Sequence, residues 1–335
     1  MTFHIITLQT PGTRLSVDRG FLVCKLPDDE LHQAEQKRVA LQDVRGVIAA
    51  VPGLAFTNAC ISRLLAQDSV ILHCDEEFKP IGWTVPLERV IRREVFANQI
   101  HCDKIYQKTL WNHFVLQKMR NQASALSSMD VEHDLNRLIE KNLPNEANVA
   151  KQYWKHYFGL LRAPQIRERK GAQKFENQAL NYGYAVLATL VHRACLMYGL
   201  LPSLGIHHDF RYRSTPLVYD VMEPYRPFID LILAEWIMDM KWDYDGEEDW
   251  RLWVQFLMNS LRQCRIKHPE DKHSHKLLDA IDKTVRSIAN CYEDEAFCEQ
   301  DSSKLWLPRL EAHYWLREGG IDDDEEQAIG QQLRV

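Results

Sequence analysis

The hydrophobic pattern changes once along the chain, near Pro86, and this change sets the fold class. Before it, short apolar or alternating runs such as HIITLQ, TRLSV and GFLVCKL are separated by turn residues, which predicts strands. From Arg89 onward, apolar residues recur with helical spacing almost to the end. The length of 335 residues is enough for two domains. We predict an α+β fold, with a β-rich domain over residues 1–90 and a larger all-α domain over residues 91–335 that includes an acidic tail after about residue 319.

Individual helices follow from spacing and capping residues. In the β-rich domain, FTNACISRLLAQD predicts one helix with Thr57 as its N-cap. In the second domain, Tyr106, Leu110 and Phe114 predict one helix, and Val131 to Ile139 predict the next, with Asp130 as its cap. A strongly apolar segment from Phe175 to Tyr198, closed by Gly199, predicts a buried central helix. Further helices are expected over residues 250–265, 274–292 and 302–317, the last interrupted at Pro308.

The charge and the cysteine content of the chain indicate which classes of function are compatible with the sequence. The formal net charge is −6, but five acids lie in residues 243–249 and five in residues 322–326, and without these ten the balance is 41 basic against 37 acidic residues, or +4. A DNA-binding face is therefore compatible with the composition, because binding follows local potential. The eight cysteines form no Cys-x-x-Cys pair, so buried thiols are expected instead of a zinc ribbon or dithiol site. No apolar run approaches the ~20 residues of a membrane span, which favours a cytoplasmic protein without membrane contact.

Polar chemistry concentrates in GIHHDFRYRSTPLVYDVMEPYRPFID, residues 205–230. Thr215 and Pro216 predict a helix start that places Asp220 and Glu223, three residues apart, on one face. Pro224 disfavours helical geometry in the residue before it, so the backbone is expected to be distorted at Glu223. Two carboxylates at a bend, close in sequence to the pair His207 and His208, indicate a binding site. The alternative is a charged helix start with surface histidines.

A third carboxylate comes from an earlier segment. Asn145 is a suitable cap for a helix that begins at Glu146, whose neighbours at i+3, i+4 and i+7 are Val149, Ala150 and Tyr153. The carboxylate therefore lies on the apolar stripe, where an unpaired charge is costly and is normally paired or bound to a metal. The alternative is a first-turn glutamate favoured by the helix dipole.

A histidine with two or three carboxylates suits Mg²⁺ or Mn²⁺, with zinc as the alternative. A hard divalent ion held by carboxylates is a common device for phosphoryl transfer, which indicates phosphodiester chemistry. Basic residues near these segments agree with a DNA substrate, although solvation alone also explains such residues. The candidate DNA contacts are Lys151, Lys155, Arg162, Arg167, Arg169, Arg211 and Arg213.

At these residues the sequence resembles the CRISPR-associated adaptation integrases, the Cas-one family. Three segments carry the resemblance: NEANVAKQYW around Glu146, QALNYGYAVL around Asn181, and LGIHH through VYDVMEPYRPFID. Any one of them is weak, and the combination is specific. The strand-rich start followed by a helical domain extends the resemblance over most of the chain.

The resemblance implies a ligand set. The family's metal ligands match Glu146, His208 and Glu223, and Asp220 matches a recurrent acid to which we assign a supporting catalytic role. His207 replaces the more usual apolar residue, so which of the two rings binds the metal stays open. Asp230 is left without a role in the site and is interpreted as structural.

The resemblance also implies partners and a reaction. It implies a homodimer through the β-rich domains that joins a small ferredoxin-like partner, the Cas-two protein, in a heterohexamer holding a double-stranded prespacer. A prespacer 3′-hydroxyl would attack a phosphodiester of the CRISPR repeat while Mg²⁺ or Mn²⁺ stabilises the developing charge. Endonuclease activity on branched DNA would be the related hydrolytic reaction.

Three other functions compete with this one. An integrase of a casposon-like mobile element would share the chemistry and differ in its target. A non-catalytic DNA-structure-binding scaffold would carry the same residues as a vestige. A zinc hydrolase of small substrates would need a pocket without a basic face.

Overall fold

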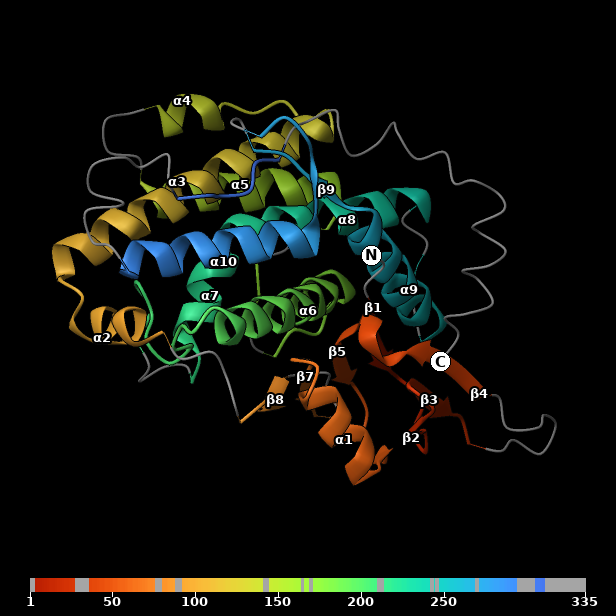
Figure 1. Cartoon of the computed structure of the whole chain (residues 1–335). Helices are drawn as coiled ribbons and strands as arrows, with labels where there is room; N and C mark the ends of the chain where they lie inside the picture. Colours follow the sequence, from red (N-terminus) through yellow and green to blue (C-terminus); the bar gives the residue numbers. More distant parts are fainter. Residues whose placement is uncertain are drawn as a thin grey trace. The chain divides into compact units, whose positions relative to one another are not determined.

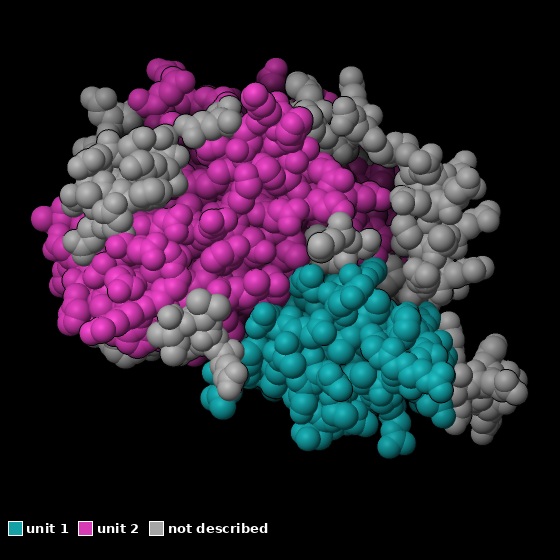
Figure 2. Space-filling view, viewed as in Figure 1, with its two compact units in different colours: residues 1–89, 319–335 teal, residues 90–318 magenta. Residues whose placement is uncertain are grey.

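The structure is a computed structural model that describes residues 4–27, 36–75, 80–87, 92–140, 145–163, 166–168, 171–209, 214–241, 244, 247–268, 271–293 and 305–310. These residues fall into two compact units, one within residues 1–89 and the other within residues 90–318 (Figure 2). Strands dominate the first unit and helices the second (Figure 1), so the predicted α+β fold class is confirmed. The predicted acidic tail lies outside the described residues.

The first unit is built from two four-stranded sheets. One has the order β1-β5-β7-β8, in which β1, β5 and β7 are parallel and β8 is antiparallel to β7. The other has the order β4-β3-β2-β6 and is antiparallel except between β2 and β6. The strands are β1 (His4–Leu8), β2 (Arg14–Asp18), β3 (Phe21–Lys25), β4 (Gln36–Ala40), β5 (Val44–Ala49), β6 (Ala55–Phe56), β7 (Val70–Cys74) and β8 (Pro80–Thr84), with a 3-10 turn η1 (Leu41–Asp43) before β5.

Both sheets contribute to one apolar core. Leu8 of β1, Leu15 of β2 and Val47 of β5 are fully buried in the same cluster as Leu64 of α1 (Asn58–Leu65). The predicted cap of this helix is confirmed, because the Thr57 side chain accepts a hydrogen bond of 3.2 Å from the backbone N–H of Cys60. Alternating or apolar sequence therefore predicted β1, β2 and β3, whereas the polar strand β4 gave no such signal.

The second unit contains most of the helices. They are α2 (Arg93–His101), α3 (Lys104–Ser128), α4 (Leu135–Ile139), α5 (Glu146–Leu160), α6 (Phe175–Met197), α7 (Pro216–Met222), the 3-10 turn η2 (Glu223–Tyr225), α8 (Arg226–Asp239), α9 (Glu247–Gln263) and α10 (Leu277–Glu293), with a short hairpin of β9 (Arg265–Ile266) and β10 (His275–Lys276). Nearly every residue of α6 is buried, because this helix packs against α7, α8, α9 and α10. The predicted central helix is confirmed, and Gly199 follows it with a φ of +76°.

Four local predictions need correction. Asp130 does not cap a helix; it follows α3 with a φ of +55°, and α4 begins only at Leu135. Residues 305–310 of the predicted helix 302–317 are not helical. The acidic stretch 243–249, whose run of charges predicts a solvated loop, is helical from Glu247, where α9 begins. Pro216 opens α7 as expected, but the Thr215 side chain makes no capping hydrogen bond.

The cysteines largely behave as expected. Cys24, Cys60, Cys74, Cys195 and Cys264 are buried thiols, and burial raises the pKa of each, to about 11 for Cys60. Cys291 departs from the expectation because it is disulfide-bonded. Among the described helices, none combines the length and the apolar character needed to span a bilayer.

Candidate active site

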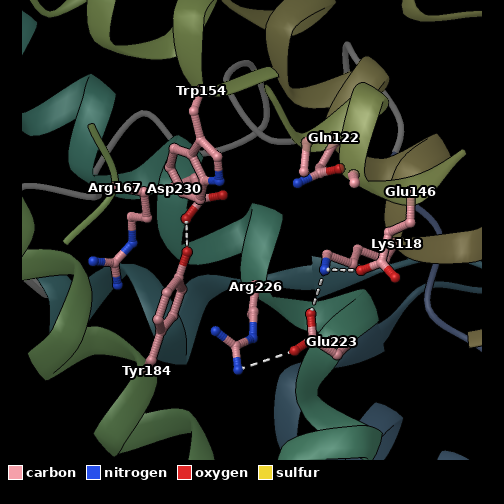
Figure 3. Close-up of a pocket in the computed structure, with 11 residues that line it drawn as sticks. Lys118, Gln122, Glu146, Trp154, Arg167, Tyr184, Glu223, Arg226 and Asp230 are labelled. Atoms are coloured by element: carbon pink, nitrogen blue, oxygen red, sulfur yellow. Dashed lines mark hydrogen bonds and ion pairs between the residues drawn. The ribbon is translucent and has the colours of Figure 1, made fainter. Parts of the chain in front are cut away.

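A cavity of about 300 Å³ lies in the helical unit, and several predicted site residues line it (Figure 3). Its walls come from α3, α5, α6, η2 and α8, together with the segment 166–168. The lining residues are Lys118, Gln122, Glu146, Ala147, Ala150, Trp154, Arg167, Tyr184, Glu223, Arg226 and Asp230. Segments more than a hundred residues apart in the sequence therefore meet at one hollow.

Two predicted carboxylates meet at one cation in this cavity. The Lys118 ammonium lies 2.8 Å from Oε1 of Glu146, to which it donates a hydrogen bond, and 2.8 Å from Oε2 of Glu223 (Figure 3). The Glu223 side chain is 6% exposed and the Lys118 side chain 11%, whereas Glu146 at the helix start is 39% exposed. Burial lowers the pKa of Lys118, but the charges of Glu223 and Glu146 outweigh it and raise the pKa overall. The two carboxylates can thus share one positive charge.

Local sequence explains where these carboxylates stand. The Asn145 side chain accepts a hydrogen bond of 3.1 Å from the N–H of Asn148, so α5 starts with Glu146 in its first turn. Pro224 lacks an N–H, and the chain passes from α7 into η2 at Glu223 before continuing as α8. The second oxygen of Glu223 pairs with Arg226 at 3.0 Å. The helix is therefore interrupted by a 3-10 turn near Pro224, as expected, but Glu223 itself keeps αR dihedrals (φ −54°, ψ −46°), so the predicted loss of helical geometry at this residue is wrong.

Asp220 does not line the cavity; it organises the histidine loop. It is fully buried, and its carboxylate accepts backbone N–H groups from Ile206, His207 and His208 at 2.7 to 3.4 Å. The Nδ1 atom of His208 lies 2.5 Å from Oδ1 of the same carboxylate. A carboxylate bonded to one ring nitrogen orients the imidazole and leaves Nε2 as the metal-binding nitrogen. This geometry matches the supporting role predicted for Asp220.

The two histidines have different surroundings. The ring of His207 stacks on Trp111, with centroids 4.3 Å apart and an interplanar angle of 5°. The ring of His208 meets Trp111 edge-on at 5.7 Å, and its side chain is 32% exposed. Both residues donate a backbone N–H to Asp220, but the ring hydrogen bond to this carboxylate is made by His208. Geometry therefore favours His208 as the ligand of the pair.

The described residues meet the requirements of a metal site in part. Among them, no group of three or more His, Cys, Asp and Glu side chains is close enough to hold one ion together. The ligand set Glu146, His208 and Glu223 therefore stays a prediction. Two of its members nevertheless converge on a single cation, and all-oxygen or mixed oxygen and nitrogen donors suit Mg²⁺ or Mn²⁺.

Another part of the cavity lining combines guanidinium groups with aromatic rings. The Arg167 guanidinium lies 5.7 Å from the ring centroid of Trp154 and 5.3 Å from that of Tyr184, over which Arg226 also lies at 4.8 Å. Arg167 is held in place by hydrogen bonds to Oδ1 of Asn177 (3.1 Å) and Oδ1 of Asn181 (2.7 Å). Guanidinium groups pair with phosphate oxygens through parallel N–H donors. This part of the lining can therefore receive a phosphodiester.

Asp230 belongs to the cavity wall, which sequence analysis did not anticipate. Its carboxylate accepts hydrogen bonds from the hydroxyls of Tyr153, at 2.7 Å, and Tyr184, and it is 1% exposed. Burial raises the pKa of Asp230 to about 6, although the two tyrosines, Arg167 and Arg226 oppose this shift. Burial also raises the pKa of both tyrosines, so their hydroxyls stay protonated and donate.

The candidate DNA contacts separate into three groups. Arg167 lines the cavity. Lys151 and Lys155 on α5 and Arg162 just after it are exposed at the surface. Arg169, Arg211 and Arg213 lie outside the described residues. Only Arg167 is therefore placed at the site by the structure, and the other basic residues stay predictions.

Sequence analysis missed Lys118, Gln122, Trp154, Tyr184 and Arg226 as cavity residues. Lys118 and Gln122 carried a usable signal, because they continue the series Tyr106, Leu110 and Phe114 at intervals of four on a buried helix face. Trp154, Tyr184 and Arg226 carried none, because aromatic and basic residues near apolar runs are common in ordinary cores.

Comparison with known proteins places this geometry in a family. The family model described as CRISPR associated protein Cas1 matches residues 6–259. The CRISPR-associated endonuclease Cas1 of Neisseria meningitidis serogroup C is 29% identical over 326 residues, covering 92% of this chain and 97% of the relative. A protein of the same name from Francisella tularensis subsp. novicida is 41% identical over 250 residues, covering 68% and 76%.

Solved structures share the fold. A casposase bound to integration product superposes with a TM-score of 0.72 at 19% identity, covering 88% of this chain and 91% of that chain. A chain of a Cas6-RT-Cas1–Cas2 complex gives a TM-score of 0.68 at 16% identity, covering 91% of this chain and 36% of that chain. The predicted resemblance to the Cas-one family is thereby confirmed, and the chain belongs to the Cas1 family.

Proposed function

We propose that this protein is a CRISPR adaptation integrase, a metal-dependent enzyme that joins prespacer 3′-hydroxyl ends to the CRISPR repeat. One observation carries the proposal: in a chain of the Cas1 family, Glu146 and Glu223 share a single cation in a cavity that also contains the guanidinium groups of Arg167 and Arg226. Carboxylates for a cation and guanidinium groups for phosphate, within one cavity, are what phosphodiester transesterification needs.

The proposed residues divide into those that would hold the metal ion and those that would face the phosphate. Glu146, Glu223 and Nε2 of His208 would hold Mg²⁺ or Mn²⁺, and Asp220 keeps the His208 ring oriented through Nδ1. When bound, the metal ion supplies a Lewis acid that polarises the phosphodiester and favours the ionised 3′-hydroxyl. Arg167 and Arg226 then face the charge that develops on the phosphate oxygens, and Trp154 and Tyr184 support the two guanidinium groups through their ring faces. Hydrolysis of branched DNA would use the same groups with water as the nucleophile.

The partners proposed for this chain are double-stranded DNA, a second copy of the chain, and a small ferredoxin-like Cas-two protein. Support comes from the solved relatives, among which one is a Cas6-RT-Cas1–Cas2 complex and another is a casposase bound to integration product. We extend this to a heterohexamer with the prespacer held between distant active sites, as the family resemblance implies.

A casposon-like integrase is a weaker reading. The similarity to the casposase is limited to the fold, at 19% identity, whereas the family model and both curated relatives are CRISPR-associated proteins. The two functions differ in their DNA target. Joining that requires a CRISPR repeat in the target plasmid, and fails with a plasmid that carries none, would exclude the casposon-like function.

A joining assay tests the proposal. Purified full-length protein with Mn²⁺ is expected to join a short duplex with free 3′-hydroxyls to a supercoiled plasmid carrying a CRISPR repeat, and a chelator should abolish joining. Glu146→Gln and Glu223→Gln keep the side-chain shape but remove the negative charge of one proposed metal ligand, so each should lower the joining rate by at least about 100-fold. Glu140→Gln, which changes an exposed carboxylate after α4, is the matched control and should retain joining.

Two outcomes would overturn the proposal. If Glu146→Gln or His208→Ala joins DNA at the rate of the unchanged protein, the substituted residue is not a ligand of the catalytic metal. If the protein binds DNA but joins none with any divalent metal, it would be a non-catalytic DNA-structure-binding scaffold. The same assay decides between the histidines, since His208→Ala should lose joining and His207→Ala should retain a measurable part of it.

A further inference from the structure

The Lys118 ammonium lies between Glu146 and Glu223, the two carboxylates predicted to bind a divalent ion. The residue is 8% exposed, and its ammonium stands 2.8 Å from one oxygen of each carboxylate. Buried charges are found where they are paired, and here one ammonium pairs with two carboxylates that come from α5 and η2. Without a cation between them, the two carboxylates would repel each other.

A metal ion and this ammonium compete for the same oxygens. Mg²⁺ requires oxygen ligands at about 2.0–2.1 Å, so both carboxylates must turn their oxygens toward it. Two cations cannot lie between the same pair of oxygens, because their mutual repulsion in a buried site is strong. Occupation by Lys118 and occupation by a divalent ion therefore exclude each other.

We infer that Lys118 is an internal counter-ion of the metal site, which holds Glu146 and Glu223 together in the metal-free protein and is displaced when a divalent cation binds. The inference rests on the proposed function, in that it takes these two carboxylates as ligands. It assigns Lys118 a positioning role: the ammonium preorganises the ligands and lowers the apparent affinity for metal.

Displacement also changes the charge of the cavity. Its side chains include three cations and, above about pH 6, three carboxylates, namely Lys118, Arg167 and Arg226 against Glu146, Glu223 and Asp230. A bound divalent ion would leave the cavity with an excess of two positive charges while the freed ammonium still faces it. The cavity would then attract a phosphodiester only after the metal is in place.

Metal titration of a variant tests the inference. Lys118→Met keeps an unbranched side chain, one atom shorter than that of lysine, and removes the charge. Calorimetry of the full chain with Mn²⁺ at pH 7.5 should show binding at least about tenfold tighter than in the unchanged protein, because the site would no longer be occupied by an ammonium. Mn²⁺ should also raise the melting temperature of the variant more than that of the unchanged protein. Lys108→Met, on the exposed side of the same helix, is the matched control and should bind Mn²⁺ with unchanged affinity.

A second measurement uses the unchanged protein, so it holds even if the variant does not fold. Acetylation by acetic anhydride, followed by mass spectrometry, should modify Lys118 slowly without metal and severalfold faster with Mg²⁺, while exposed Lys108 reacts equally in both conditions.

The outcomes separate the inference from the proposed function. Unchanged Mn²⁺ affinity in Lys118→Met, or equal acetylation of Lys118 with and without Mg²⁺, would refute displacement while leaving the metal site intact. Absence of Mn²⁺ binding to any form, or binding by Glu146→Gln as tight as by the unchanged protein, would refute the metal site itself. Tighter binding by Lys118→Met with loss of binding by Glu146→Gln supports both.

Discussion

Asp230 is a carboxylate whose negative charge is destabilised by the fold. Its side chain lies against the hydroxyls of Tyr153 and Tyr184 at a 1% exposed position of α8. Removal from water raises its pKa from 3.8 to about 6, and the neighbouring donors and arginines only reduce that shift. Because the folded-state pKa exceeds the unfolded value, the folded protein holds this proton more tightly. Stability is therefore lost as pH rises from about 4 to 6.

Asp230→Asn should remove this pH dependence. A pKa difference of about two units between the folded and unfolded states corresponds to about 3 kcal/mol. Between pH 4 and pH 6.5, the unfolding free energy of the unchanged protein should therefore fall by about this amount relative to that of the variant. Urea unfolding of both proteins across this range measures the difference, and other titrating groups cancel in the comparison. Asp239→Asn, at an exposed position at the end of the same helix, serves as the control and should follow the unchanged protein. Parallel stability curves for Asp230→Asn and the unchanged protein would contradict the account.

The rule that identified Glu146 from sequence would also have identified Lys118. Both are charged residues on an apolar helical stripe, at i−3 from Val149 in one case and at i+4 from Phe114 in the other. The sequence cannot show that the two stripes face each other, because 28 residues separate them and their contact is a tertiary one. The sequence could therefore show that each charged residue has an unusual position, but it could not show that Lys118 and Glu146 form an ion pair.

At the level of elements, the loop from Gly205 to His208 is built around the Asp220 carboxylate. Three successive backbone N–H groups point at one buried anion, an arrangement that fixed partial charges make favourable. The approach is so close that a Cβ atom on Gly205 would lie 2.3 Å from the carbonyl oxygen of His208 and 2.9 Å from Oδ2 of Asp220. Only glycine fits at this position without moving the loop.

Gly205→Ala should therefore destabilise the protein by about 1–3 kcal/mol, since the added methyl group forces backbone shifts. It should also slow DNA joining, because the shift displaces His208. Gly159→Ala is the matched comparison, because Gly159 lies within α5 and no atom lies within 4 Å of the position of an added methyl group. Alanine at this position should stabilise the helix by about 0.5–1 kcal/mol. Thermal unfolding of the two variants should shift in opposite directions, and equal shifts would refute the close packing of the loop.

Elements with strong local signals were predictable, and those decided by distant contacts were not. Asn145 and Pro224 act on their neighbours, so the start of α5 and the break at η2 could be read from the sequence. The segment 305–310 has helical spacing around it but forms no helix, because its backbone is bonded elsewhere. Its Leu310 N–H donates to Asn121 of α3, and its Pro308 carbonyl accepts from the same side chain.

At the level of the helical unit, Asn121 connects three segments that lie far apart in the sequence. It is fully buried, one turn beyond Lys118 on α3, and all its hydrogen-bonding capacity is used. Its Nδ2 donates to the carbonyls of Pro224 (2.7 Å) and Pro308 (2.9 Å), and its Oδ1 accepts from Gln117 (2.8 Å) and the N–H of Leu310 (3.1 Å). The turn that carries Glu223 and the segment 305–310 are thus tied to one amide.

Asn121→Ala should weaken both connections together. It removes the Asn121 amide as the partner of two buried carbonyls and a buried N–H, so we expect a loss of about 3 kcal/mol in unfolding free energy. Thr109→Ala, on the exposed face of the same helix, should change stability little.

Amide exchange distinguishes a shared connection from a general loss of stability. If Asn121 ties Glu223 to the segment 305–310, the N–H groups of Leu310 and of η2 should exchange faster in Asn121→Ala under native conditions, by a factor larger than that of α6 in the same unit. DNA joining should fall as well, because Glu223 is no longer held against the cavity. Uniform acceleration across the unit would mean that Asn121 contributes to packing alone, whereas selective acceleration would show that the segment 305–310 supports the catalytic turn from the far end of the chain.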